Sequence, residues 1–582
     1  MAHEKNLIKT TGLVLTTILI ISLPQGIAAT PIDNDKIPSQ HRVMAFYYPW
    51  YGGQGGDGKA RHWGRIDAVK NNIEESRDYP LSGAYSSHEP KTIEQHCKWA
   101  SQAGIDTFIV SWWGQGTYED IAMPLILDTC QKFGMTACAY YETVPDPKTP
   151  QAAADDILRI LDKYAAHSSY LKANGRPVVF IYGRAMEEIG LYGWHQTGQI
   201  LNEKYHDGVA LIGDRMSDGA ACIFDGIHTY NTCGQLHGKS AEQISVWCKT
   251  QYAKWVGHAR QNNRISTLTI IPGYDDTKIR KPGLNTGRLD GQLYQLQWQN
   301  AIIAMPDWIL ITSFNEWHEG SEIEPSMEYK DRYLKLTRQY AGQFKTSKAI
   351  TEPGKSSFTE NEYTLLRQKL QGKTIAVLPQ PESAAFWFLL NCKINTRILG
   401  WDEVAKGLDP KTYPFLLYAG NETYLTTVHK PADVDEAIIT YLKNGGVLLV
   451  FPSGPMPFYY NQSNKKVVNA ASKFGLLLNQ GWWEQPPQGS NLFYVQKNKN
   501  LPHLPPSFAF PKDGDLRWRP FISNGKTKSR SLLTLRDNKG KTYGDALVIV
   551  YLDSGGQVAY GWFGLIQEYS RQVMYDVLML IN

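Results

Sequence analysis

The sequence lacks several features that would point to common classes of protein. It has no long run of basic residues, and 60 Lys and Arg against 56 Asp and Glu leave a net charge of only +4. A nucleic-acid-binding protein concentrates positive charge on one face, so we expect no nucleic-acid partner. After the N-terminal region, no stretch reaches the roughly 18 apolar residues of a membrane-spanning helix. We therefore expect no stable membrane anchor.

Cysteine is also scarce. The chain has seven cysteines, an odd number, scattered at positions 97, 130, 138, 222, 233, 248 and 392. None of them forms the C-x-x-C pair that is typical of zinc and redox sites. One or two disulfides would be compatible with an oxidising compartment, but the spacing gives no support for zinc or redox chemistry.

The N-terminus has the pattern of an export signal. Lys5 and Lys9 precede an apolar run over residues 12–23, and small residues follow at 26–29. A positive start, a short apolar segment and a small-residue cleavage site characterise a signal peptide. We predict a signal peptide over residues 1–29 and a periplasmic or secreted mature protein.

From about residue 40, short apolar runs alternate with amphipathic, helix-like stretches. The expected strands lie at 43–50, 107–113, 136–143, 177–183, 209–214, 226–231, 268–274 and 308–314. Eight such repeats predict a (β/α)8 TIM barrel over residues 40–345. A doubly wound open sheet is the alternative, although no G-x-G-x-x-G follows the first run, which disfavours its nucleotide-binding version.

A chain of 582 residues is too long for one core. Residues 346–373 are polar and are predicted to form a linker. The alternation restarts over 374–582, which predicts a smaller flavodoxin-like or amidotransferase-like α/β domain with extra β strands. An amidotransferase needs a nucleophilic Cys at a strand–turn–helix elbow, and the turns at 419–421 and 452–454 contain none. We expect an accessory domain that packs on the barrel or contacts glycan.

The candidate catalytic residues lie within residues 307–325. An apolar run over 309–312 leads into Asn315-Glu316-Trp317-His318-Glu319-Gly320. Two carboxylates at the end of a buried strand can divide proton donation and acceptance between them. A lone E-x-x-E is more often a solvated acidic turn. Aromatic and polar residues follow most of the other predicted strands, however, and barrel enzymes place their catalytic groups at such ends. Aromatic faces beside carboxylates suit a sugar.

Several motifs together resemble glycoside hydrolase family 99, which contains endo-α-mannosidases and endo-α-1,2-mannanases. The motifs are Tyr47–Gly52, His62-Trp63, Tyr85–Ser87, Gly104–Asp106, Ser111–Gly114, Pro272–Thr277 and Asn315–Gly320. The resemblance covers about residues 40–345. It implies a (β/α)8 barrel that cleaves α-mannosides with retention and without a metal or other cofactor. It also implies that the 2-hydroxyl of the substrate acts as the nucleophile, through an anhydro-sugar.

Carried onto this sequence, the resemblance makes Glu316 the base that deprotonates the 2-hydroxyl and Glu319 the acid that protonates the leaving oxygen. Trp113 replaces a Tyr of the animal Golgi enzymes, which favours mannose over glucose in the next subsite. The expected substrate contacts are Tyr47, His62, Trp63, Trp113, Glu142, Tyr182, Tyr230, Tyr274, Asp276, Trp317 and His318. The segments Thr143–Pro145 and Arg280–Gly283 depart from the family pattern and leave the particular glycan open.

These observations predict an exported, retaining, endo-acting hydrolase of α-mannosidic linkages, whose partner is α-mannan or an N-glycan-type oligosaccharide. A hydrolase of another α-glycan, or a sugar-binding protein on the same barrel, remains an alternative. Transfer from a nucleotide sugar is disfavoured because no nucleotide-binding loop is present. A zinc protease is excluded because Glu322 stands where the second His of H-E-x-x-H would have to be.

Overall fold

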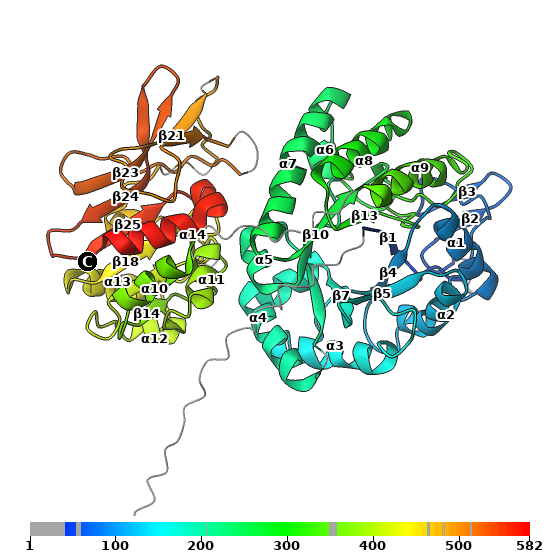
Figure 1. Ribbon diagram of the computed structural model, residues 1–582, viewed down its shortest axis with the longest axis horizontal. Coiled ribbons are helices and arrows are strands. Elements are labelled where there is room, and N and C mark those ends of the chain that lie inside the picture. Colours follow the sequence, from blue (N-terminus) through cyan, green and yellow to red (C-terminus); the bar gives the residue numbers. More distant parts are fainter. Residues whose placement is uncertain are drawn as a thin grey trace, which may run out of the picture.

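The computed structural model describes residues 41–53, 60–206, 208–347, 358–461, 466–479, 481, 483–489, 491–511 and 515–581. Two domains lie side by side (Figure 1), a barrel and a smaller α/β domain. The predicted signal peptide lies outside the described residues. None of the helices in the described ranges is long and apolar enough to cross a membrane.

The first domain is a closed barrel of eight parallel strands. These are β1 (Arg42–Tyr47), β4 (Thr107–Trp112), β5 (Thr136–Tyr141), β7 (Arg176–Ile181), β8 (Ala210–Asp214), β9 (Gly226–His228), β10 (Ile265–Ile270) and β13 (Trp308–Ile311). Each strand pairs with the next of this series, β5 pairs with β7, and β13 returns to pair with β1. The predicted TIM barrel is confirmed and the open sheet is excluded. Nearly every strand residue is buried, as expected for strands covered on both faces.

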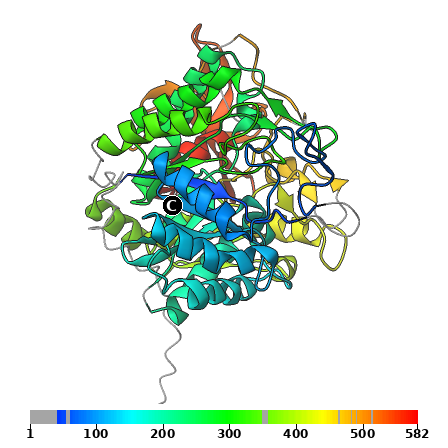
Figure 2. The same cartoon turned by 90° about the vertical axis from the view of Figure 1, so that its right-hand side faces the viewer.

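Helices surround the barrel on its outer side, as Figure 2 shows with that domain turned toward the viewer. Thr117, Thr149 and Ser240 cap three of them, because each side chain accepts a backbone N–H of the first turn. The helices are α1 (Pro90–Gln102), α2 (Tyr118–Lys132), α3 (Pro150–Tyr164), α4 (Gly183–Lys204), α5 (Asp218–Ile223), α6 (Cys233–Leu236), α7 (Ala241–Gln261), α8 (Gln292–Ala304) and α9 (Arg332–Thr346). Short hairpins decorate the loops: β2 (Ile66–Asp67) with β3 (Asn72–Ile73), and β11 (Tyr274–Asp275) with β12 (Asn285–Thr286).

The second domain is built on a mixed sheet of nine strands. In spatial order these are β15 (Thr396–Ile398), β14 (Ile375–Val377), β16 (Phe415–Tyr418), β18 (Val447–Val450), β25 (Gln557–Gly561), β24 (Thr542–Tyr551), β23 (Lys528–Asp537), β21 (Leu492–Gln496) and β22 (Ser507–Ala509). The first five are parallel and the others pair antiparallel. The helices include α11 (Ala384–Asn391), α12 (Trp401–Ala405), α13 (Asp433–Lys443) and α14 (Phe563–Leu580). The predicted α/β domain with extra strands is confirmed.

The structure differs from the predicted linker. Helix α10 (Glu360–Lys369) lies within residues 346–373. Thr359 accepts a hydrogen bond from the Glu362 backbone N–H, and the Glu362 carboxylate accepts one from the Thr359 N–H. This reciprocal capping box starts a helix even in a polar sequence. The helix packs against α14, so it is part of the second domain.

The second domain packs on the barrel, which is one of the two roles expected for it; the other was contact with glycan. Arg571 of α14 donates to both carboxylate oxygens of Asp218 at the start of α5, at 3.2 and 2.8 Å. Lys254 of α7 pairs with Glu568 of α14 at 3.0 Å. Helices α5 and α11 also meet at this junction (Figure 1). All seven cysteines are buried and unpaired in the structure.

Candidate active site

Glu316 and Glu319 lie in the loop that follows β13, at the carboxyl end of the barrel. Two contacts fix this loop. Asn315 accepts a hydrogen bond from the Tyr48 N–H at 2.8 Å and donates to the Tyr48 carbonyl at 3.0 Å. The Glu316 N–H donates to Ser313 Oγ at 2.7 Å. The loop is therefore tied to the end of β1, and both glutamates have defined positions.

Glu316 is buried and is paired with His318. The His318 Nδ1 lies 3.3 Å from Glu316 Oε1, and the His318 backbone N–H donates to the same oxygen at 3.1 Å. The His318 Nε2 donates to the His62 carbonyl at 2.7 Å. Burial disfavours the imidazolium, but the contacts with Glu316 and Glu75 outweigh it and raise the pKa of His318 to about 10. Glu316 thus faces a positive charge at neutral pH.

Glu319 has a different environment. Its carboxylate accepts hydrogen bonds from Tyr230 Oη at 3.2 Å, Tyr274 Oη at 3.1 Å and Arg280 Nη1 at 3.1 Å. Burial, followed by the charge of Glu316, raises the pKa of Glu319 to about 7, although Arg280 opposes this shift. A carboxyl with a pKa near neutral can carry a proton and also release it, which is the requirement for a general acid.

A third buried carboxyl, Glu142, follows β5. Ser111 Oγ donates to it at 2.7 Å, and Trp113 Nε1 donates to Ser111 Oγ at 3.0 Å. Burial raises the pKa of Glu142 to about 8, against the effect of the Ser111 hydrogen bond. At neutral pH this carboxyl therefore exists largely in its protonated form and can donate a hydrogen bond as well as accept one.

Half-buried aromatic side chains surround these carboxyls. The Tyr182 ring centroid lies 6.0 Å from that of Tyr230, and the guanidinium of Arg184 lies over Trp113 at 4.8 Å. The His62 ring stacks on Trp50 with 4.8 Å between centroids. Rings next to paired carboxyl groups offer both the apolar faces and the polar partners that a sugar needs.

Most of the predicted site residues come together. Asp276 joins them through its Oδ2, which accepts from Tyr274 Oη at 3.0 Å and from Arg280 at 2.6 Å. The residues that meet at the carboxyl end of the barrel are His62, Trp113, Glu142, Tyr182, Tyr230, Tyr274, Asp276, Glu316, His318 and Glu319.

Three predicted contacts lie elsewhere, and the expectation that they touch substrate is corrected. Tyr47, Trp63 and Trp317 have no exposed surface. Their polar atoms bond within the protein: Tyr47 Oη with His96 Nδ1 at 3.0 Å, Trp63 Nε1 with the Tyr85 carbonyl at 2.8 Å, and Trp317 Nε1 with Glu324 Oε2 at 3.0 Å. These aromatic side chains support the loops and do not line the site.

The sequence-based prediction missed Tyr48 and Arg280 as site residues. Burial, and then the charges of Glu142, Glu316 and Glu319, raise the pKa of Tyr48 well above its ordinary range, so its hydroxyl lies among three carboxyls. Strand alternation could have found it. Phe46 points into the barrel against Tyr140 and Tyr230, and the residue two positions later points the same way. Within the described ranges, no group of three or more His, Cys, Asp or Glu is arranged to hold a metal ion.

Comparison with known proteins identifies the family to which the barrel belongs. The sequence model described as Glycosyl hydrolase family 99 matches residues 38–343, more than half of the chain. The chain belongs to glycosyl hydrolase family 99. It is therefore a glycoside hydrolase, as predicted, and the family match ends before the second domain begins.

Relatives of this family 99 hydrolase occur in animals and bacteria. The glycoprotein endo-alpha-1,2-mannosidase of Rattus norvegicus is 28% identical over 368 residues, which cover 54% of the chain and 78% of the relative. The Xenopus laevis protein of the same name is 28% identical over 381 residues, covering 55% and 82%. The solved GH99 endo-alpha-mannosidase from Bacteroides thetaiotaomicron is 28% identical, with 52% of this chain and 97% of that chain covered and a TM-score of 0.45.

Proposed function

We propose that this family 99 hydrolase cleaves α-mannosidic linkages within mannan or N-glycan-type oligosaccharides, with retention of configuration. The names of its relatives, endo-alpha-1,2-mannosidase and endo-alpha-mannosidase, support the linkage and the endo mode. The assignment of base and acid rests on the different surroundings of the two glutamates. Glu316 is paired with an imidazolium, whereas Glu319 is bonded to two phenols and has a pKa of about 7.

In the first chemical step, the Glu316 carboxylate removes the proton from the 2-hydroxyl of the mannose to be cleaved. The 2-oxygen then bonds to C1 and the C1–O bond to the leaving glycan breaks, which gives a 1,2-anhydro sugar. Glu319 delivers its proton to the departing oxygen. Neither glutamate bonds to carbon, so the carboxyl separation that distinguishes ordinary retaining and inverting enzymes does not apply here.

In the second step the roles reverse. The Glu319 carboxylate takes a proton from a water molecule. The oxygen of that water bonds to C1, and the C1–O2 bond breaks. Glu316 returns its proton to O2. Two inversions at C1 give net retention, and both glutamates end as they began. The pKa of about 7 suits Glu319 to this exchange, because the proton is neither held too tightly nor lost before use.

The surrounding residues bind and orient the sugar. The protonated Glu142 can donate to a sugar hydroxyl while it accepts from Ser111. Trp113 and Tyr182 offer half-buried ring faces for the C–H surface of a mannose. The N-terminal pattern over residues 1–29 supports export of the enzyme to the periplasm or the medium, where polymeric mannan would be accessible.

Product analysis tests this proposal. The purified mature protein is incubated with an α-1,2-branched mannan, an α-1,6-linked mannan and a glucosylated mannose oligosaccharide, and products are resolved by mass spectrometry. We expect a defined di- or oligosaccharide from at least one substrate, absent with Glu319→Gln. Release of single mannose units would contradict the endo mode. If the protein bound these substrates but hydrolysed none of the three, it would be a sugar-binding protein or a hydrolase of another α-glycan.

A further inference from the structure

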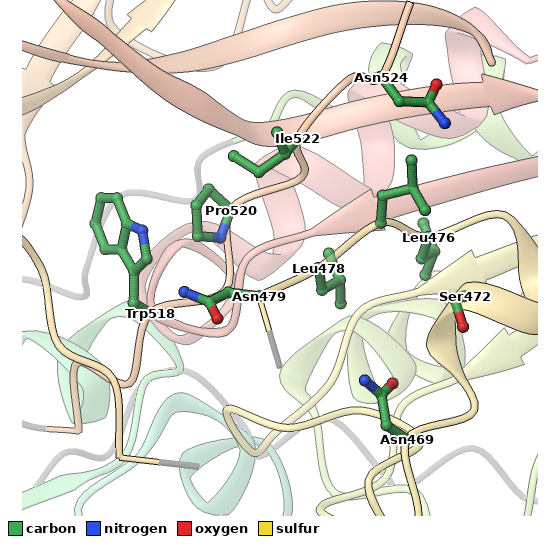
Figure 3. A pocket seen from close by; sticks show the side chains of 10 residues that line it. Asn469, Ser472, Leu476, Leu478, Asn479, Trp518, Pro520, Ile522 and Asn524 are labelled. Carbon is green, nitrogen blue, oxygen red and sulfur yellow. The ribbon is translucent and has the colours of Figure 1, made fainter. Parts of the chain in front are cut away.

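The second domain contains a cavity that the proposed reaction does not use. It has a volume of about 360 Å³ and lies between the segment that follows β20 (Lys466–Val467) and the segment 518–524 (Figure 3). Ligand pockets in proteins typically begin at about 300 Å³. The two walls are joined by backbone hydrogen bonds, since the Ile522 N–H donates to the Leu477 carbonyl at 3.0 Å and Leu478 pairs with Phe521. The cavity is therefore part of the folded domain and is largely formed before any ligand arrives.

The lining combines amides with apolar surface and contains no charged side chain among the described residues that form it. Asn469, Asn479 and Asn524 supply three amides and Ser472 a hydroxyl, while Trp518, Ile522 and a row of leucines supply apolar contact. An amide donates and accepts, which matches the hydroxyls of a sugar. A phosphate, a carboxylate or a nucleotide would find no cation in this lining to balance its charge. The chemistry thus selects an uncharged, hydroxyl-rich ligand.

One atom in this lining has an unmet hydrogen-bonding need. Asn469 Oδ1 is buried and accepts no hydrogen bond from any described residue. Buried side-chain oxygens are normally satisfied, and an orphan calls for a ligand or a solvent partner. Figure 3 shows Asn469 below the other labelled side chains and Trp518 to their left. A ligand hydroxyl would satisfy the amide while a ring lies toward the indole.

Trp518 is held in place for such contact. Its ring is packed edge-on against Trp562 at 5.2 Å, and its backbone N–H donates to the Glu484 carbonyl at 2.6 Å. The segment that it contacts also presents Trp483, which is 73% exposed, beside Arg517. Trp518 itself is 8% exposed, so its packed indole offers the cavity a small apolar surface of the kind that contacts the C–H face of a pyranose.

The geometry points to a carbohydrate-binding site in this cavity, which holds an uncharged pyranose of the same glycan class and is separate from Glu316 and Glu319. Such a site raises the affinity of the enzyme for long or polymeric chains by a second attachment, without any change in the chemical step. It extends the proposed function rather than replacing it, because it gives the second domain a ligand of its own.

Hydrogen–deuterium exchange on the full-length Glu319→Gln protein tests the inference. The probes are methyl α-D-mannopyranoside and an α-1,2-linked mannotriose. We expect slower exchange in peptides covering 469–479 and 518–524, and about tenfold weaker binding at this site in Asn469→Leu, the equivalent of one lost hydrogen bond. Ile522→Trp, at a position 48% exposed, should block the same protection by filling the cavity. Asn538→Leu, on an exposed turn of the same domain, is the matched control.

The outcomes separate the two sites. The Asn469→Leu and Ile522→Trp substitutions, placed in the otherwise wild-type enzyme, should leave kcat on a short substrate unchanged and raise KM on polymeric mannan. Protection confined to barrel peptides would overturn the inference and leave the proposed function standing. Protection at 469–479 and 518–524 that persists equally in both variants would also overturn it. Protection there without any hydrolysis by the wild-type enzyme would support the cavity and refute the proposed reaction.

Discussion

His318 Nδ1 lies 3.3 Å from Glu316 Oε1, and the backbone N–H of His318 donates to the same oxygen. The imidazole is fixed from its other side by the His62 carbonyl at 2.7 Å. This arrangement places a cation beside the glutamate that we propose as the base. Glu319, three residues later in the chain, has phenols and Arg280 instead. These different neighbours support the opposite proton transfers that we propose for two chemically identical side chains in one loop.

Loss of the acid should be severe and specific. We expect Glu319→Gln to lower kcat on mannan by about two to four powers of ten, because general acid–base catalysis contributes that much. Glu242→Gln, on the exposed first turn of α7, is the control and should keep full activity. Steady-state rates at matched protein concentration measure the effect. Normal turnover by Glu319→Gln would remove this residue from the mechanism.

The descending limb of the pH profile should report Glu319. Its raised pKa of about 7 predicts that kcat/KM falls as the pH rises through about 7, because the acid loses its proton. Arg280 stabilises the ionised form, so Arg280→Met should move this limb to higher pH. Rates measured from pH 5 to 9 in both proteins test the shift. An unmoved limb would show that Arg280 does not control the acid.

The His318 pair should contribute to stability in a defined pH range. The folded-state pKa of about 10 is above the ordinary value of 6.5, so the contribution is complete below pH 6.5 and is lost as the pH rises toward 10. We expect His318→Gln to be less stable than wild type at pH 6, with a difference that shrinks by pH 9. Urea midpoints at the two pH values provide the measurement, and a constant difference would contradict the assignment.

Two adjacent tyrosines offer a matched comparison. Tyr48→Phe should lower kcat/KM by about tenfold or more, because it removes a hydroxyl that lies among the carboxyls of the site. Tyr47→Phe removes only the hydrogen bond to His96 and should cost about 1 kcal/mol of stability with little effect on rate. Equal kinetic effects of the two substitutions would be inconsistent with the structure.

The junction between the domains depends on Arg571 and Asp218, whose side chains are only 18% and 8% exposed. Arg571→Leu should destabilise the protein by about 3 kcal/mol, because it leaves the buried Asp218 carboxylate without its cationic partner, although Asn262 still donates to it. The double variant Arg571→Leu/Asp218→Leu should recover part of this loss. Urea unfolding of both variants measures the effect. If the double variant were the less stable, the pair would not be the cause.

Much of this molecule was predictable from the sequence. The barrel was predictable, because its strands are buried on both faces and therefore appear in the sequence as separate apolar runs. The meeting of Glu142, Tyr230 and Glu316 at the carboxyl end of the barrel was also predictable, because each of them follows a predicted strand. The direction of individual aromatic side chains was less accessible. Trp63 and Trp317 stand beside site residues in the chain, but both are buried, with hydrogen bonds to the Tyr85 carbonyl and to Glu324, 22 and 7 residues away.

Three other features were not predicted: helix α10, the contact of Arg280 with Glu319, and the cavity of the second domain. The T-x-x-E capping box at Thr359 and Glu362 was a readable helix signal inside a stretch that is polar enough to suggest a linker. The Arg280 contact with Glu319 joins positions 39 residues apart. The cavity of the second domain joins segments 469–479 and 518–524. Neither juxtaposition follows from periodicity, because each depends on how loops fold back onto the sheets.

A substrate whose leaving group needs no protonation distinguishes the base from the acid. An α-mannobiosyl fluoride still requires the base for attack by the 2-oxygen, but fluoride departs without an acid. We predict that Glu319→Gln releases fluoride in its first turnover at close to the wild-type rate, because only the later opening of the anhydro sugar by water needs Glu319, whereas Glu316→Gln does not release it. Equal loss in both variants, or rescue of Glu316→Gln alone, would contradict the assignment of base and acid.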